Sequence, residues 1–146
     1  MALGSATEAC CLMGDEERAV RYYRRLTHPP YRKANQDLCA AKGIYLDEEA
    51  RRSKAAIAYR VAKARADASD AQDRSDYRTM LSRAQAILSE AEAPADRELG
   101  HTFAVRAACM LGDAPLAQEH LAGLGDKDQR YFIGWCKMQH VELTDP

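Results

Sequence analysis

A seven-residue stretch that occurs twice decides the fold: ACCLMGD at residues 9–15, and AACMLGD at residues 107–113, 98 positions later. Downstream of both copies, small, large and apolar residues recur in the same order. With a shift of one residue, the similarity extends to a cysteine and a leucine further on. The matched pairs are Ala19 and Ala117, Tyr23 and Leu121, Leu26 and Leu124, Cys39 and Cys136, and Leu46 and Leu143. This pattern predicts an internal duplication of about 38 residues.

Each copy contains a Gly-Asp pair that predicts a tight turn between two helices. Gly14 and Gly112 are placed to adopt the left-handed conformation that ends a helix. The aspartate after each of them can cap the next helix. Gly125 and Asp126 predict a third such turn, with Gln129 in the position of a capping box. Alanine and arginine are abundant, β-branched residues are scarce and no stretch alternates like a strand, so the sequence predicts an all-α protein.

The composition excludes several classes of protein. The 146 residues fit one domain or a run of small repeats. With 21 basic and 22 acidic residues, the chain lacks the basic excess of a general nucleic-acid binder, so no nucleic-acid partner is expected. No apolar run is long enough to predict a membrane span. Residues 1–13 lack a basic start and contain Glu8, so they do not predict a secretory signal peptide.

Charge is distributed unevenly along the chain. Residues 1–65 hold 13 basic and 8 acidic side chains, a net charge of +5, whereas residues 66–146 hold 8 and 14, a net charge of −6. Solvated helix faces are the simplest explanation. The other possibility is a homo-oligomer in which the basic end of one copy meets the acidic end of the next.

The spacing of small and large residues resembles the tetratricopeptide repeat, a helix-turn-helix unit of 34 residues. In that spacing, a small residue is followed by a large one four positions later, and by a small or apolar one three positions after that. The triplets that obey it are Ala19-Tyr23-Leu26, Ala55-Tyr59-Ala62, Ala84-Leu88-Ala91 and Ala117-Leu121-Leu124. The separation of 98 residues between the two copies is close to three such units.

The resemblance implies a single domain, a stack of about four antiparallel helical hairpins. The units are expected at about residues 2–26, 33–64, 66–92 and 97–124, followed by a capping helix at about residues 127–141. Residues 47–65 are a candidate for one long helix. Residues 67–75 are polar and are expected to be either helical or a mobile loop.

Such a stack implies a protein–protein interaction module, a scaffold or adaptor, which binds a partner segment in a concave groove lined by the first helix of each unit. By this resemblance, the groove candidates are Glu8, Asp73, Tyr77, Thr102, Arg106 and Met110. On the last helix, either Tyr131 and Trp135 anchor a partner, or Phe132, Trp135 and Cys136 pack on the fourth unit as a cap. The alternative function is a regulatory or sensor C-terminal domain of a larger bacterial kinase or envelope-assembly protein.

Four of the five cysteines fall at duplicated positions, Cys11 with Cys39 and Cys109 with Cys136. Because the resemblance places the first helices of neighbouring units side by side, a disulfide bond can join each pair. Buried free thiols are the alternative, since cysteine packs well in protein cores. Cys10 is unpaired in either case. Bridged pairs would indicate the periplasm or cell envelope, and free thiols the cytoplasm.

No motif predicts catalysis, a cofactor or a metal ion. The sequence contains no phosphate-binding glycine-rich loop, no nucleophile elbow and no H-E-x-x-H motif. Cys10 and Cys11 are adjacent and cannot easily chelate one ion together. None of the histidines has a second histidine at the spacing of neighbouring helical turns; they are His28, His101, His120 and His140. The sequence therefore predicts neither an enzyme nor a metal site.

Overall fold

The computed structural model describes residues 3–146 and confirms that this part of the chain is all-α, with nine helices and no strand. Its internal contacts divide the chain into two compact units, unit 1 at residues 1–59 and unit 2 at residues 60–146. The boundary between them falls inside helix α5 (Lys54–Asp73). The antiparallel stack of tetratricopeptide-like hairpins stays a prediction.

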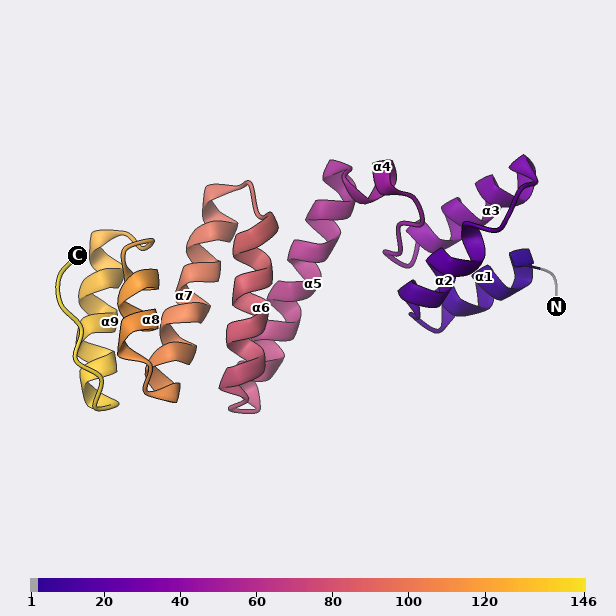
Figure 1. The fold of residues 1–146 in the computed structure, drawn as a ribbon. Coiled ribbons are helices and arrows are strands. Elements are labelled where there is room, and N and C mark those ends of the chain that lie inside the picture. The colour runs from indigo at the N-terminus through magenta and orange to yellow at the C-terminus, as the bar shows by residue number, and fades with distance from the viewer. Residues whose placement is uncertain (1–2) are drawn as a thin grey trace. The chain divides into compact units, whose positions relative to one another are not determined.

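Unit 1 is built from α1 (Leu3–Leu12), α2 (Glu16–Tyr23), α3 (Pro29–Ala40), the short α4 (Glu48–Arg51) and the start of α5 (Figure 1). Helix α1 packs against both α2 and α3. After α3 the chain folds back and buries two apolar side chains in the same core. The core residues are Cys10, Cys11, Ala19, Val20, Tyr23, Leu26, Cys39, Ile44 and Leu46.

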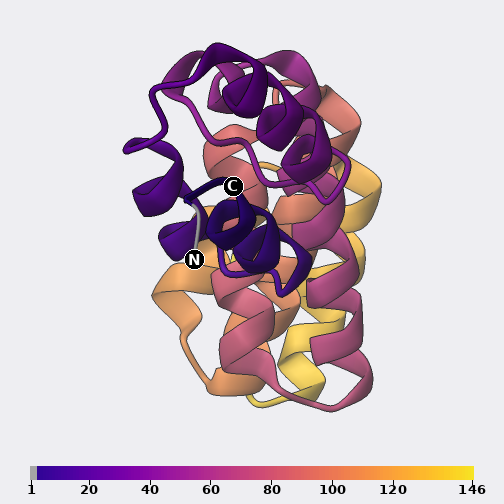
Figure 2. The ribbon, with the colours of Figure 1, turned by 90° about the vertical axis from the view of Figure 1, so that its right-hand side faces the viewer.

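Unit 2 contains most of α5 and then α6 (Tyr77–Glu90), α7 (Pro94–Leu111), α8 (Ala114–Leu121) and α9 (Asp126–Met138). Figures 1 and 2 show these helices side by side along their lengths. Helix α7 is central, because it packs against α6, α8 and α9. Small residues allow this close packing: a side chain at Gly100 of α7 would come within 2.9 Å of Leu88 on α6.

The predicted duplication is visible in the turns of the two copies. Gly14 and Gly112 both have a φ of +75°. The aspartate after each glycine accepts a hydrogen bond from a backbone nitrogen 3.1 Å away and so caps the next helix. The left-handed glycine and the capping aspartate predicted for both turns are therefore confirmed.

The segments after α3 and α9 also match. The amide of Ile44 donates to the carbonyl of Cys39 at 2.9 Å, and the amide of Val141 donates to the carbonyl of Cys136 at 3.0 Å. Leu46 and Leu143, two residues further on, are both buried. Each copy thus comprises a helical hairpin, a third helix and a short apolar tail that covers the same core.

The third predicted turn is wrong. Gly125 has a φ of −71° and is itself the N-cap of α9, with Asp126 as the first helical residue. Gln129 does not complete a capping box, because its side-chain amide donates to the carbonyl of Leu124 at 2.8 Å. Asp126 instead places its charge in the first turn of the helix, where the helix dipole favours it.

The helices between the two copies also differ from the prediction. Asp47 caps the short α4, and Ser53 caps α5 through its hydroxyl, 3.2 Å from the amide of Ala56. The long helix therefore starts at Lys54 rather than at residue 47. It then runs to Asp73, because it contains neither glycine nor proline. The predicted border between repeat units near residue 65 consequently lies in mid-helix, and residues 67–73 are helical.

Candidate functional site

An open groove lies between α5 and α7 in unit 2, and we call it the α5–α7 groove. It encloses about 410 Å³. One wall consists of side chains from successive turns of α5, and the other of two apolar side chains one turn apart on α7. The lining residues are Ala62, Arg65, Ala66 and Ser69 on α5, and Leu99 and Phe103 on α7.

The groove has an apolar wall on α7, whereas its α5 wall also carries the polar Ser69 and, at the rim, the cation of Arg65. Leu99 and Phe103 are only half-buried, so part of each side chain is open to a ligand. The small side chains of Ala62 and Ala66 leave room opposite them. The exposed Arg65 is held by Asp96, whose carboxylate oxygen lies 3.0 Å from the guanidinium. This arrangement suits a bulky apolar side chain from another molecule.

Three of the predicted groove residues follow one line along α7. Thr102, Arg106 and Met110 are spaced by four residues each, which places them one turn apart. The guanidinium of Arg106 lies 5.8 Å from the ring centres of both Phe132 and Trp135 on α9. This cation–π contact connects the face of α7 with the face of α9. Met110 is 36% exposed at the end of the line.

The other predicted groove residues lie elsewhere. Asp73 is the exposed last residue of α5. Tyr77 begins α6 and packs, half-buried, against a core cluster that includes Met80 and Ala107. The sequence assigned Tyr77 to the first helix of a repeat unit, whereas in the structure it is the first residue of α6, which follows the unbroken α5. Glu8 is exposed on α1 and belongs to unit 1.

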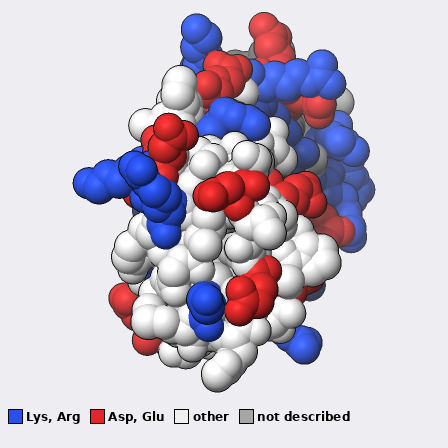
Figure 3. Space-filling model, turned by 90° about the vertical axis from the view of Figure 1, so that its left-hand side faces the viewer, with Lys and Arg blue, Asp and Glu red and all other residues white. Residues whose placement is uncertain are grey.

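The aromatic side chains of α9 divide between the core and the surface. Phe132 is 3% exposed, and Trp135 is half-buried against the same core, with its ring edge-on to Phe132 at 6.0 Å. Tyr131 is 55% exposed. Figure 3, which views unit 2 from the side of α9, shows mostly uncharged side chains with scattered charges between them. Phe132 therefore packs as part of a cap, whereas Tyr131 is free to contact a partner.

Both predicted cysteine pairs are confirmed. Cys11 is bonded to Cys39 with a Cα separation of 5.2 Å, and Cys109 to Cys136 with a Cα separation of 5.5 Å. The bonds join α1 to α3 and α7 to α9, at equivalent places in the two copies. Cys10 is buried and free, as predicted.

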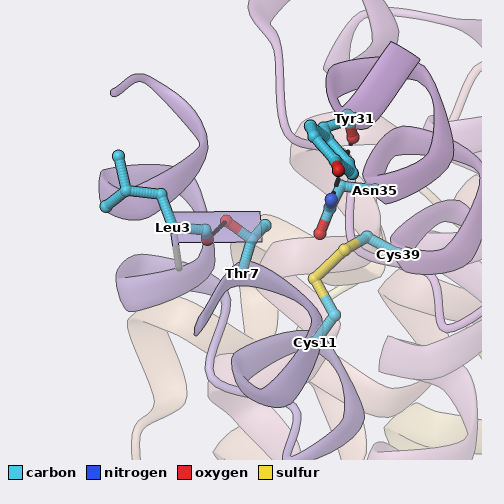
Figure 4. The surroundings of a disulfide bond; sticks show 6 residues. All are labelled: Leu3, Thr7, Cys11, Tyr31, Asn35 and Cys39. Atoms are coloured by element: carbon cyan, nitrogen blue, oxygen red, sulfur yellow. Dashed lines mark hydrogen bonds between the residues drawn. A yellow bond between two sulfur atoms is a disulfide. The ribbon is translucent and has the colours of Figure 1, made fainter. Parts of the chain in front are cut away.

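The two disulfides have different surroundings. One turn before Cys109 and Cys136, the buried residues are Val105 and Phe132. At the equivalent positions of unit 1 they are Thr7 and Asn35, as Figure 4 shows. The Thr7 hydroxyl donates to the carbonyl of Leu3, and the Asn35 amide nitrogen donates to the carbonyl of Tyr31, both at 2.9 Å. The side-chain oxygen of Asn35 has no hydrogen-bond partner.

We expect Asn35→Leu to raise the free energy of unfolding by about 1 kcal/mol, because it removes a buried acceptor without a donor. The carbonyl of Tyr31 loses the hydrogen bond from Asn35 at little cost, since it lies within helix α3. Denaturant unfolding followed by circular dichroism measures the change, with Asn35→Asp as the control that must lower stability by burying a charge. A leucine variant less stable than the wild type would show that Asn35 is satisfied in solution.

Sequence spacing missed one pair of side chains, His101 on α7 and His120 on α8. Their Nδ1 atoms are 3.2 Å apart, within hydrogen-bond distance. His120 is 8% exposed, and His101 lines an open pocket of about 550 Å³ together with Arg97, Glu98 and the turn before α9. Burial, followed by the nearby His120 and Arg97, lowers the pKa of His101, whereas Glu119 acts in the opposite direction. The two histidines are 19 residues apart in the sequence, so their spacing does not predict a contact. The turn at Gly112 brings the two rings together.

Comparison with family models, with curated proteins and with solved structures found no match to the chain. No helix within residues 3–146 combines the length and the apolar character that crossing a membrane requires.

Proposed function

We propose that the chain is a protein–protein interaction module, and that unit 2 binds a segment of another protein in the α5–α7 groove. The observation that carries this proposal is the groove itself, where Leu99 and Phe103 remain half-exposed between two packed helices. A recess with exposed apolar side chains on one wall is a typical place for a side chain of a partner.

The chemistry of the surrounding face supports a particular kind of segment. A bulky apolar side chain fits against Leu99 and Phe103, and the small residues of α5 give it space. Along α7 the segment then meets Arg106, whose guanidinium already lies over two aromatic rings. A carboxylate of the segment can pair with that guanidinium. We infer a segment that carries an apolar anchor followed by an acidic residue, in an extended or helical conformation.

The two disulfide bonds support an oxidising compartment, such as the periplasm or the cell envelope, as the place where this binding occurs. Nothing in the groove resembles a set of catalytic side chains, so the proposal assigns no reaction to it. Its role is that of a scaffold or adaptor.

A photo-crosslinking amino acid identifies the partner and its position together. We expect benzoylphenylalanine at Ser69, in the groove, to give a discrete crosslinked product in the native host. The matched control is Gln85, which is exposed on α6 and does not line the groove. Equal crosslinking from both positions would contradict the proposal.

Arg106→Glu is expected to weaken binding of the captured partner at least tenfold, because it replaces an attractive charge by a repulsive one. Arg78→Glu makes the same change on the exposed surface of α6 and should leave the affinity within about twofold. Isothermal titration calorimetry measures both. Far-ultraviolet circular dichroism verifies that each variant is folded, because Arg106 lies so close to Trp135 that its replacement changes the tryptophan fluorescence directly.

A further inference from the structure

The contact between His101 and His120 is a feature that packing does not require. The duplication supplies the comparison, since the equivalent residues of unit 1 are Leu3 and Tyr22. These two are partly buried apolar side chains that pack against the core of unit 1. An apolar pair therefore suffices at this place in the fold, and unit 2 holds two imidazoles there instead.

A third residue, Gly123, also differs from its equivalent in unit 1. A side chain at Gly123 would overlap the ring of His101. The equivalent residue of unit 1 is Arg25. Gly123 thus provides the space in which the His101 ring reaches His120. Two histidines and the glycine that accommodates them form a built arrangement rather than a chance contact.

We propose that His101 and His120 bind one divalent transition-metal ion, such as Zn²⁺, through their Nδ1 atoms. Two nitrogens that each lie about 2.0–2.1 Å from a tetrahedrally bound zinc ion are about 3.3 Å apart. The Nδ1 atoms of His101 and His120 are 3.2 Å apart. The spacing of the two nitrogens therefore matches that of two zinc ligands, and the rings need to rotate so that both Nδ1 lone pairs converge on an ion between α7 and α8.

Binding requires a change of tautomer and no loss of a proton. In the hydrogen bond between neutral rings, one Nδ1 carries the proton and the other accepts it. When the ion binds, the donor ring moves its proton to Nε2, and both Nδ1 lone pairs face the metal. The hydrogen bond is replaced by two metal–nitrogen bonds.

The other coordination positions are open. No three His, Cys, Asp or Glu side chains in residues 3–146 are grouped so as to hold an ion. Glu98, one turn before His101, lines a pocket of about 550 Å³ with it but does not complete a group of three ligands. Water occupies the positions that remain. A site with two protein nitrogens holds an exchangeable ion, so we expect an affinity in the micromolar range.

Zinc titration tests the proposal, in buffer without thiol reductant, which would itself bind zinc. We expect one saturable site by calorimetry and a rise in the thermal unfolding midpoint with zinc concentration. His101→Leu and His120→Tyr introduce the residues that unit 1 already uses, and each should weaken binding at least tenfold. His28→Gln, at an exposed histidine of unit 1, should leave the affinity unchanged.

A measurement on the wild type makes the test independent of variant folding. In an NMR titration, zinc should shift the imidazole signals of His101 and His120 at one equivalent. Absence of saturable binding would overturn the proposal. So would shifts confined to His28 and His140, or an affinity that His101→Leu leaves unchanged, because the two rings would then share only a hydrogen bond.

Discussion

Replacement of Cys109 and Cys136 together by alanine should lower the free energy of unfolding by about 3–4 kcal/mol. Their bond closes a loop with a sequence separation of 27 residues and ties α9 to α7. In the chain-entropy model, a loop of this size restricts the unfolded chain by about that amount. Helix α9 contributes the buried side chain of Phe132 to the core, so its release also exposes apolar surface.

Chemical denaturation measures this effect, and the fluorescence of Trp135 on α9 reports it from unit 2 itself. The double variant Cys11→Ala and Cys39→Ala is the matched comparison, since it opens a loop with a sequence separation of 28 residues in unit 1. Cys10→Ala is the control that leaves both bonds in place. A loss below about 1 kcal/mol for the Cys109 and Cys136 variant would show that packing alone fixes α9.

Gly43→Ala should lower the free energy of unfolding by about 3 kcal/mol. Gly43 has a φ of +73°, which costs an alanine about 1–2 kcal/mol. In addition, a Cβ atom at this position would overlap the ring of Tyr59. The Tyr59 hydroxyl donates to the carbonyl of Lys42 at 3.2 Å, so displacement of the ring also breaks this link between α5 and the turn after α3.

Gly14→Ala separates the cost of the left-handed backbone from the cost of the overlap with the Tyr59 ring. Gly14 has a φ of +75°, but a Cβ there would meet no atom within 4 Å, so we expect a loss of only about 1–2 kcal/mol. Thermal or denaturant unfolding of both variants gives the comparison. Equal losses for the two glycines would mean that the Tyr59 ring moves aside without cost.

The features that the sequence predicted correctly are those with a local or a duplicated signal. Gly14 and Gly112 end helices because these positions require a left-handed backbone conformation. The Gly-Asp pair in the sequence predicts such a helix end. The pairing of the four cysteines followed from their being copied together at almost equal separations, whereas the sequence left open whether the pairs are bonded. Both signals can be read from this one sequence.

The features that the sequence analysis predicted wrongly or missed have different physical causes. Gly125 is followed by an aspartate, as Gly14 is, yet its φ is −71°, because Gly125 is the N-cap residue of α9. Tyr77 was expected in the groove, but it begins α6 after the unbroken α5 and packs against a core cluster that includes Met80 and Ala107. The pairing of His101 with His120 depends on the space at Gly123, which no spacing rule expresses.

The most direct test of the proposed function is the dissociation constant of the crosslinked partner for Ala66→Tyr, which fills the α5–α7 groove with a ring. Ala86→Tyr places the same ring on the exposed surface of α6 and serves as the control. The proposal predicts that Ala66→Tyr raises the dissociation constant at least tenfold, a loss of about 1.4 kcal/mol, while Ala86→Tyr changes it less than about twofold. If the two variants bind the partner equally well, the groove is not the binding site.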